Sequence, residues 1–546
     1  MQQASLRGIS FHHPVAFWFG CALLIAGVLS HGPMLAMGAH THYHLAGMPM
    51  DPVMLAGMAV IPLGLVLAMY GLMPRLEQMR QVLQRARDHL SFHIADNVPL
   101  NSEHWTLVIV LIVALAIDVM KPATLGFVMP GMTAEYAISK QTGGVLALVA
   151  LCGTTVGSVV WGRIGDVFGR RAAILLAALM FMGTAICGAM PSYAWNLAMC
   201  FMMGLAAGGM LPIAFTLMAE TVPAAHRGWL LVMLGGIGTS AGYLLAAGAA
   251  TLLEPEFSWR SLWLLNLPTG AVILLLNRWI PESPRFLSSV GLENEARAVL
   301  LKFAGSGSVP GQPLLERDAT PDAEADTGDS AIGMRQLLRG RHAGITWGLI
   351  LCGVAWGLVN FGFLLWLPTN LVNLGIEAKG TSALLARSAI LALPGIALVV
   401  WLYHRWSSFK SLVLFIALTA CALLAFCFMA LAGVRSSEAT TLSAVALLVS
   451  ISGVIAMLIP YAAEIYPVQL RGTGSGLIAA SSKFGGILGA ALGVLGFFEH
   501  FVWSAVLIAV PMVISAVLLM ASGIETRGVG LEAIQQKLLR VPAPEL

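Results

Sequence analysis

Fourteen apolar segments, each near the length that a helix needs to cross a bilayer, dominate this chain of 546 residues. A spanning helix takes about 20 apolar residues, and every backbone polar group must be paired within the span. Only 10% of the residues are charged, against about a quarter in soluble domains. The chain is therefore predicted to be an all-α polytopic protein of the lipid bilayer. The segments are 14–37, 52–73, 105–130, 142–161, 172–190, 194–218, 229–252, 260–280, 344–368, 382–404, 411–433, 439–462, 473–496 and 501–522.

The positive charges predict how these segments are oriented. If both termini are cytoplasmic, 23 of the 30 Lys and Arg residues fall on cytoplasmic segments. Four lie on outward loops and three lie within spans. This bias matches the positive-inside rule. The first two spans stand apart from the other twelve, which fall into two sets of six around the hydrophilic segment 281–343.

Several classes of function are excluded by composition and motifs. A net charge of +3 is too small to indicate nucleic-acid binding, and none of the seven cysteines forms a C-x-x-C pair. The sequence has no G-x-x-x-x-G-K-[ST] or H-E-x-x-H motif, and neither ATP-driven transport nor an enzyme is expected. No cofactor is predicted. The apolar run after Arg7 is not followed by a small-x-small cleavage site and is interpreted as a retained helix.

An internal repeat supports the division into six plus six. The segment 219–228 (AETVPAAHRG) recurs as 463–472 (AEIYPVQLRG), with Ala, Glu, Pro, Arg and Gly matching at an offset of 244 residues. Each copy is predicted to end one span and begin the next at the equivalent point of its half. Parallel halves of this kind occur in facilitator transporters.

Three motifs carry a resemblance to a known family. The segment 162–171 (GRIGDVFGRR), predicted as a tight charged turn, resembles the G-x-L-x-D-x-x-G-R-R loop of the major facilitator superfamily. The segments 281–287 (PESPRFL) and 525–528 (ETRG) resemble the P-E-S-P-R and P-E-T-K-G marks of its sugar-porter and metabolite:proton symporter branch. The second half has no good copy of the first motif: residues 403–410 (YHRWSSFK) lack its carboxylate, which predicts an asymmetric gate.

The resemblance implies a fold of two six-helix bundles, with twelve core helices, plus two added N-terminal helices. The expected parts are 1–74 for the extra helices, 75–104 for an amphipathic cytoplasmic linker, 105–280 for the first bundle, 281–343 for a central cytoplasmic loop with disorder at 303–334, 344–523 for the second bundle and 524–546 for a cytoplasmic tail.

The resemblance also implies a cytoplasmic gate of ion pairs that closes the inner end of the outward-open state. Headgroup binding explains the arginines but not the carboxylates among them. The predicted members are Gly162, Asp166, Gly169, Arg170, Arg171, Glu220, Arg227, Glu282, Arg285, Glu464 and Arg471.

Asp118 and Lys121 are the ionisable pair within a predicted span, three residues apart and so on one helix face. Ionisable groups inside spans are costly and mark functional sites by default. Asp118 would carry the proton, and Lys121 would hold an anion or tune the carboxylate. The alternative is an ion pair that only makes insertion tolerable. Pro122, which follows, favours a bend.

Trp356, Asn360 and Phe361 could line one face of the seventh core helix and offer rings and an amide to an organic solute. Ordinary helix packing is the alternative. Lys483, early in the eleventh core helix, either faces the cavity or extends to the headgroups. The segment 364–369 (LLWLPT) resembles organic-ion symporters more than sugar porters, and no glutamine pair of the sugar-porter kind is present.

The first outward loop is rich in histidine and methionine. His40, His42 and His44 are candidate ligands for copper or another soft-to-borderline metal. A loop can also carry these residues without binding a metal.

Together these features predict a proton-coupled secondary transporter that moves a small organic solute, an organic ion rather than a sugar, by alternating access. The alternatives are proton-coupled efflux of toxic compounds and binding or transport of a metal. The expected partners are the substrate, protons and the lipid bilayer, without nucleic acid. The expected state is a monomer in a bacterial inner membrane.

Overall fold

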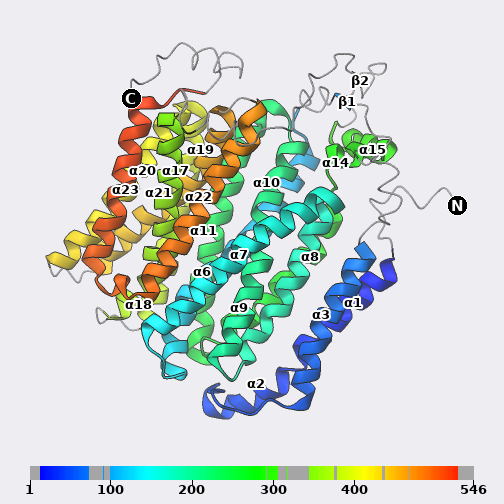
Figure 1. Cartoon of the computed structure of the whole chain (residues 1–546), viewed down its shortest axis with the longest axis vertical. Coiled ribbons are helices and arrows are strands. Elements are labelled where there is room, and N and C mark those ends of the chain that lie inside the picture. Colours follow the sequence, from blue (N-terminus) through cyan, green and yellow to red (C-terminus); the bar gives the residue numbers. More distant parts are fainter. Residues whose placement is uncertain are drawn as a thin grey trace. The chain divides into compact units, whose positions relative to one another are not determined.

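The computed structural model describes residues 13–72, 90–91, 99–289, 292–304, 316–317, 338, 343–373, 378–432, 437–465 and 468–526. These residues are almost entirely helical (Figure 1). The one described sheet pairs the two-residue strands β1 (Leu90–Ser91) and β2 (Glu316–Arg317), which run antiparallel. Three predicted segments lie mostly outside the described residues: the linker, the tail, and the part of the central loop, 303–334, that the sequence predicts to be disordered.

The chain begins with a helical hairpin of α1 (Pro14–Leu29) and α3 (Pro52–Leu72), joined through α2 (Gly32–Gly38) and η1 (Ala39–Thr41). Figure 1 shows α1 and α3 side by side. Glycines spaced by seven bring the two backbones together, because a Cβ on Gly64 would lie 2.7 Å from the Gly20 oxygen and one on Gly27 2.8 Å from the Gly57 oxygen. Such backbone contact is how small residues hold helices together in lipid. The hairpin also contacts α8 (Arg170–Gly183), where Ile61 meets Gly183.

Replacing Gly64 with leucine is expected to separate the hairpin, because a larger side chain would meet the Gly20 oxygen and the Leu24 backbone. Overpacking of this kind costs about 1–3 kcal/mol or more. Cross-linking yield between cysteines placed on α1 and α3 should fall sharply, while Gly32→Leu, at a glycine with open space, should leave the yield unchanged. Equal yields in both variants would contradict glycine-mediated packing.

The helices of the first half follow in chain order. They are α6 (Ser102–Glu135), α7 (Lys140–Phe168), α8, η2 (Thr184–Ala189), α9 (Tyr193–Ala207), α10 (Met210–Thr221), α11 (Ala224–Phe257), α12 (Ser261–Leu264), α13 (Asn266–Leu276) and η3 (Asn277–Trp279). Two helices of the loop between the halves follow, α14 (Pro284–Ser289) and α15 (Glu293–Ala304). Lys302 of α15 forms an ion pair with Glu103 at the start of α6, 2.9 Å apart.

The helices of the second half are α17 (Ala343–Leu358), the π-helical turn η5 (Val359–Phe363), α18 (Leu364–Asn373), α19 (Ala378–Arg405), α20 (Ser408–Leu431), α21 (Ser437–Ile465), α22 (Val468–Val494), η6 (Phe497–Glu499) and α23 (Phe501–Ser522). The repeated ten-residue segment behaves as predicted in both halves. It ends α10 and begins α11 in the first half, and it ends α21 and begins α22 in the second.

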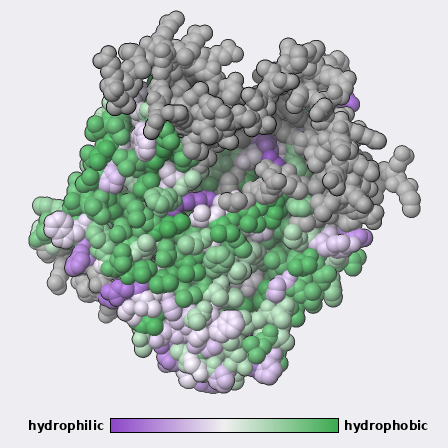
Figure 2. All heavy atoms as spheres, viewed as in Figure 1, coloured by the Kyte–Doolittle hydropathy of each residue, from purple (hydrophilic) through white to green (hydrophobic). Residues whose placement is uncertain are grey.

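The described residues contain 12 helices long and apolar enough to cross a membrane. The predicted span 194–218 is divided into α9 and α10, and the predicted span 260–280 into α12, α13 and η3, so the predicted count of fourteen single spans is not confirmed. Gly208 and Gly209 interrupt the first of these between α9 and α10. Large apolar side chains such as Val15, Leu495 and Trp503 are at least 70% exposed. Figure 2 shows that hydrophobic residues cover much of the described face, as a lipid-facing surface requires.

The predicted turn at 162–171 is much shorter in the structure than expected. Helix α7 continues to Phe168 and α8 begins at Arg170, so only Gly169 lies between them. Gly169 adopts φ +102°, a region that side chains with a Cβ rarely enter. One glycine is therefore enough to change the chain direction here.

The chain divides into two compact units that do not follow the halves of the sequence. Unit 1 comprises Met1–Lys121, Cys152–Leu230 and Glu256–Ala323, and unit 2 comprises Pro122–Leu151, Leu231–Pro255 and Glu324–Leu546. Helix α6 passes from one unit to the other between Lys121 and Pro122, at the proline where the sequence predicts a bend. Unit 2 thus combines parts of α6, α7 and α11 with the helices of the second half.

Candidate functional site

Unit 1 contains the buried ion pair that the sequence predicts on α6. Lys121 Nζ lies 3.0 Å from Asp118 Oδ1, and the two residues are 1% and 5% exposed. The ammonium also lies 3.6 Å from the centroid of the Phe181 ring on α8, a cation–π contact. Both charges are thus buried away from solvent. Loss of either partner would leave the other as an unpaired buried charge, which strongly destabilises the fold.

Unit 2 contains the predicted aromatic residues of the seventh core helix. Trp356 Nε1 donates to the Ile451 carbonyl on α21 at 3.1 Å, and its ring meets that of Phe361 edge to face with centroids 6.0 Å apart. The π-turn η5 places these two rings together, since five residues are near one turn of a π-helix. Trp356, Asn360 and Phe361 are all half-buried. Local π-helix is frequent at functional sites.

Helix α11 adds polar groups to unit 2 that the sequence did not single out. Tyr243 is 8% exposed, and its hydroxyl has no hydrogen-bond partner among the described residues. Its ring packs against Phe127 of α6 at 5.9 Å. One turn earlier, Ser240 donates to Ser452 on α21 at 3.1 Å. Ser452 follows Ile451, the acceptor of the Trp356 indole, so Ser240 and Trp356 bond to neighbouring residues of α21.

Sequence patterns gave only a weak signal for this cluster. Ser240 and Tyr243 lie three residues apart and so on one helix face, but serine and tyrosine are common in membrane helices. What distinguishes Tyr243 is a buried hydroxyl that lacks a partner, because most buried polar groups are hydrogen-bonded. Burial and partners become visible only in the folded chain.

Glu282 organises the predicted gate in unit 1. Its carboxylate accepts the backbone N–H groups of Arg170 at 2.6 Å and Arg171 at 3.2 Å, at the first turn of α8. It also accepts the N–H of Ser283 at 3.0 Å. A carboxylate at a helix N-terminus satisfies unpaired donors and complements the helix dipole. Burial raises the pKa of Glu282 to about 7, against the opposing effects of these N–H donors and of the nearby Arg170 charge.

The two arginines of the motif extend this network. The Arg170 guanidinium donates to the Gly165 carbonyl at 2.8 Å and lies 3.4 Å from Glu220. Arg171 Nε donates to the Asn277 side chain at 2.7 Å. The structure thus brings together Arg170, Arg171, Glu220 and Glu282 of the predicted gate, and Gly169 leaves room for the Glu282 carboxylate.

The second half repeats this helix cap with different residues. Glu525 accepts the N–H of Ser408 at 3.0 Å, at the start of α20, and the hydroxyl of Ser408 at 2.7 Å. The Ser407 hydroxyl also donates to Glu525. Glu282 and Glu525 follow the last core helix of their halves, and each caps the third core helix of its half, α8 or α20. Ser408 of α20 stands where Arg170 stands in α8, and Phe409 where Arg171 stands, but the carboxylate cap is present in both halves.

The other predicted gate residues are placed less fully. The surroundings of Gly162 and the side chains of Asp166, Arg285, Glu464 and Arg471 lie outside the part of the structure that is described, although the backbone is helical at all five. Arg227 and Lys483 are half-buried, on α11 and α22. The gate roles of these residues remain predictions.

The predicted metal ligands His40, His42 and His44 are exposed on η1 and the turn after it. Within the described residues, no group of three or more His, Cys, Asp or Glu side chains is arranged to hold a metal ion. The structure therefore gives no support to a site made of these three histidines.

The chain has two repeated helical halves, and one span contains a buried ion pair. Each half also has a helix that is capped by a carboxylate. These features define an integral membrane transporter of the facilitator type. The family model of the Major Facilitator Superfamily matches residues 107–490. The chain belongs to this superfamily, and the N-terminal hairpin precedes the matched region.

Relatives of known activity are transporters, not enzymes. The chain is 28% identical to the "Niacin transporter NiaP" of Acinetobacter baylyi, over 80% of this chain and 98% of that protein. It is 28% identical to the "4-hydroxybenzoate transporter PcaK" of Pseudomonas aeruginosa, over 77% of this chain and 93% of that protein. It is 25% identical to the "Gallate transporter" of Pseudomonas putida, over 73% and 86%.

The solved structure of the xylose transporter XylE from E. coli, in an inward-open conformation, has the same fold. It matches with a TM-score of 0.62 at 16% identity and covers 80% of this chain and 99% of that chain. This likeness confirms the predicted superfamily fold.

Proposed function

We propose that this protein is a secondary transporter of small organic acids, with an aromatic carboxylate as substrate, driven by protons through Asp118. It would act by alternating access as a monomer in a bacterial inner membrane, with both termini in the cytoplasm. The relatives transport niacin, 4-hydroxybenzoate and gallate by name, and each of these compounds has an aromatic ring that carries a carboxylate.

The observation that carries this proposal is the aromatic and hydroxyl cluster of unit 2. The half-buried Trp356 and Phe361 offer ring faces and edges on which a planar solute can pack. Tyr243 offers a buried hydroxyl without a described partner, and Asn360 offers an amide. A few polar groups set among aromatic side chains are typical of sites for small organic ligands.

Proton coupling is supported by the buried Asp118–Lys121 pair. Protonation of Asp118 would remove the counter-charge that lies 3.0 Å from the Lys121 ammonium. The buried pair therefore has a protonated and a deprotonated state of Asp118, and these two states differ in electrostatic energy. A proton carried by such a group can bias one conformation of a transporter over another.

The direct test is uptake into proteoliposomes that hold the purified protein, with radiolabelled nicotinate, 4-hydroxybenzoate, xylose or an organic cation. We expect a transmembrane pH gradient to drive accumulation of the aromatic acids alone, and a protonophore to abolish it. The direction of the gradient that drives accumulation tells import from efflux. Accumulation of xylose or of the cation instead would overturn the substrate class, and indifference to the gradient would overturn the coupling.

Replacing Tyr243 with phenylalanine is expected to raise the KM for the transported acid by about tenfold to a hundredfold. A hydrogen bond to a charged group contributes roughly 1.5–3 kcal/mol, and phenylalanine retains the ring packing on Phe127. Trp503→Phe, at a 70% exposed ring of α23, is the matched control and should leave KM unchanged. An unaltered KM in Tyr243→Phe would remove this hydroxyl from the site.

A further inference from the structure

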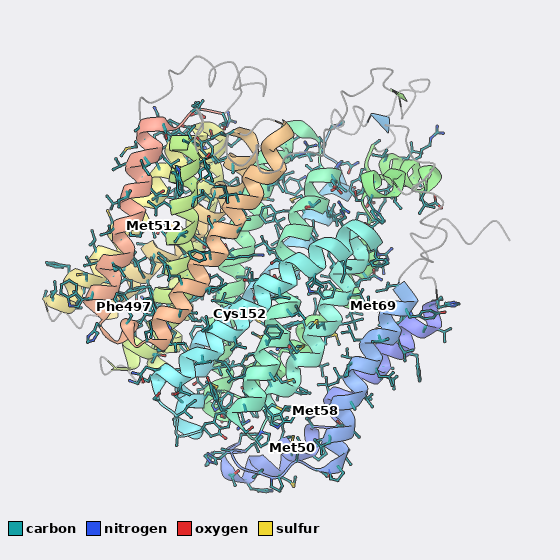
Figure 3. All side chains as sticks on the ribbon, in the orientation of Figure 1. Met50, Met58, Met69, Cys152, Phe497 and Met512 are labelled. Carbon is teal, nitrogen blue, oxygen red and sulfur yellow. The ribbon has the colours of Figure 1, made fainter. Side chains whose placement is uncertain are left out.

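The loop between α1 and α3 contributes methionines to a small buried hydrophobic cluster. Met34 and Met54 are each 2% exposed and pack with Leu45 and Ala189 in one buried cluster. Met48 and Met50 pack against it. Figure 3 places Met50 at the α2 end of the hairpin and Met69 toward the opposite end of α3. Four methionines thus belong to this buried cluster or pack against it. They come from α2, from α3 and from the segment between them.

His31 comes three residues before Met34 of this cluster, with one ring nitrogen held by a backbone carbonyl and the other without a hydrogen-bond partner among the described residues. Its Nδ1 lies 3.0 Å from the Gly27 carbonyl oxygen, which can only accept, so Nδ1 carries the proton. Nε2 then presents a lone pair, yet the residue is 1% exposed and Nε2 has no hydrogen-bond partner in the described chain. Metal-binding histidines commonly donate the other ring N–H to a backbone carbonyl in this way.

Backbone geometry puts His31 on the same helix face as Met34, one methionine of the cluster. The N–H of Leu35 donates to the His31 carbonyl, so the segment is helical and His31 lies one turn before Met34 and Leu35 on the same face. The Gly27 carbonyl that holds the imidazole is also in contact with Gly57 of α3. Gly57 lies one turn from Met54, so this contact between the two helices is one turn from His31 on one side and one turn from Met54 on the other.

We propose that His31, Met34 and Met54, with Met48 and Met50 beside them, form a binding site for the soft monovalent ion Cu(I). Thioethers select Cu(I) over divalent ions, and imidazole is a good additional ligand. Hard and borderline divalent ions are disfavoured, because the described residues contain no group of three His, Cys, Asp or Glu that could hold them. The site differs from the exposed His40, His42 and His44 and is independent of the transported substrate.

The test is competition for Cu(I) between the full-length protein in detergent and the chromophoric chelator bicinchoninate, under a reductant. We expect the wild type to withdraw one Cu(I) ion per chain. His31→Ala and the double variant Met34→Leu/Met54→Leu should each weaken binding by about tenfold or more, because even outer-shell changes at metal sites cost about 10–100-fold. The leucines keep the apolar volume of the cluster, so the double variant should fold.

The matched control is the triple variant His40→Asn/His42→Asn/His44→Asn, which should bind Cu(I) like the wild type. A thermal-stability measurement with the silver ion, a redox-inert substitute for Cu(I), is an independent readout. Silver should raise the melting temperature of the wild type and of the triple variant but not of the Met→Leu double variant. Unchanged binding by the double variant, or loss of binding only in the triple variant, would overturn the proposal, and so would a wild type that withdraws no copper.

Discussion

Replacing Asp118 with asparagine is expected to abolish proton-driven accumulation of substrate while leaving substrate exchange across the membrane intact. Asparagine keeps the shape of the side chain but cannot take up a proton at the transport pH. Exchange needs only binding and the conformational change, whereas accumulation needs the proton. Both can be measured in proteoliposomes, as accumulation under a pH gradient and as counterflow without one.

The variant has a second effect that must be separated from the first. Asparagine leaves the Lys121 ammonium, 1% exposed, without its counter-charge, and breaking a buried ion pair in this way costs about 3–5 kcal/mol. The double variant Asp118→Asn/Lys121→Met removes the uncompensated charge at similar volume. We expect it to regain stability but not accumulation. If either variant accumulates substrate like the wild type, the pair is structural and the coupling proposal is wrong.

Replacing Glu282 with alanine is expected to destabilise the protein by about 3 kcal/mol or more. The carboxylate accepts three backbone N–H groups, those of Arg170, Arg171 and Ser283. Each buried donor left unpaired costs roughly 1–3 kcal/mol. The melting temperature in detergent should fall clearly. Glu256→Ala, at an exposed carboxylate, is the control and should leave the melting temperature unchanged.

The pH dependence of this cap has a definite sign. Burial raises the pKa of Glu282 from 4.5 to about 7, so the folded protein binds this proton more tightly than the unfolded chain does. Stability from this group is therefore highest below pH 4.5 and falls as the pH rises from 4.5 to 7, by up to about 3 kcal/mol. In Glu282→Gln, which does not titrate, that fall should be absent. A parallel pH profile in both proteins would contradict the assignment.

The second cap offers a comparison within the same chain. Glu525→Ala should release the N-terminus of α20 as Glu282→Ala releases that of α8, because both carboxylates accept a backbone N–H in the first turn of their helix. Glu525 also accepts the hydroxyls of Ser407 and Ser408. A loss of stability in only one of the two variants would show that the carboxylate cap does not stabilise both halves equally.

The positions of the helices followed largely from the sequence, because a bilayer imposes length and hydrophobicity on every span. The ion pair Asp118–Lys121 was also predictable, since residues three apart on a helix face each other whatever surrounds them. The interrupted spans at 194–218 and 260–280 were not, because hydropathy averages over a break of one or two residues.

Contacts between distant segments account for what sequence could not predict. Residues 403–410 show no carboxylate, yet Glu525, 117 residues from Ser408, supplies one to the same helix end. The Gly27 carbonyl decides which ring nitrogen of His31 carries the proton. The residues packed around α11 leave the Tyr243 hydroxyl without a described hydrogen-bond partner.

The sequence by itself therefore determined the class of protein, the helical halves and the local pairs, since these depend on composition and on spacing along one helix. Only the tertiary structure decided which carboxylate caps which helix, and which buried hydroxyl and which buried ring nitrogen have no described hydrogen-bond partner. The physical reason is that burial and hydrogen-bond partnership are properties of packed neighbours, and those neighbours come from remote parts of the chain.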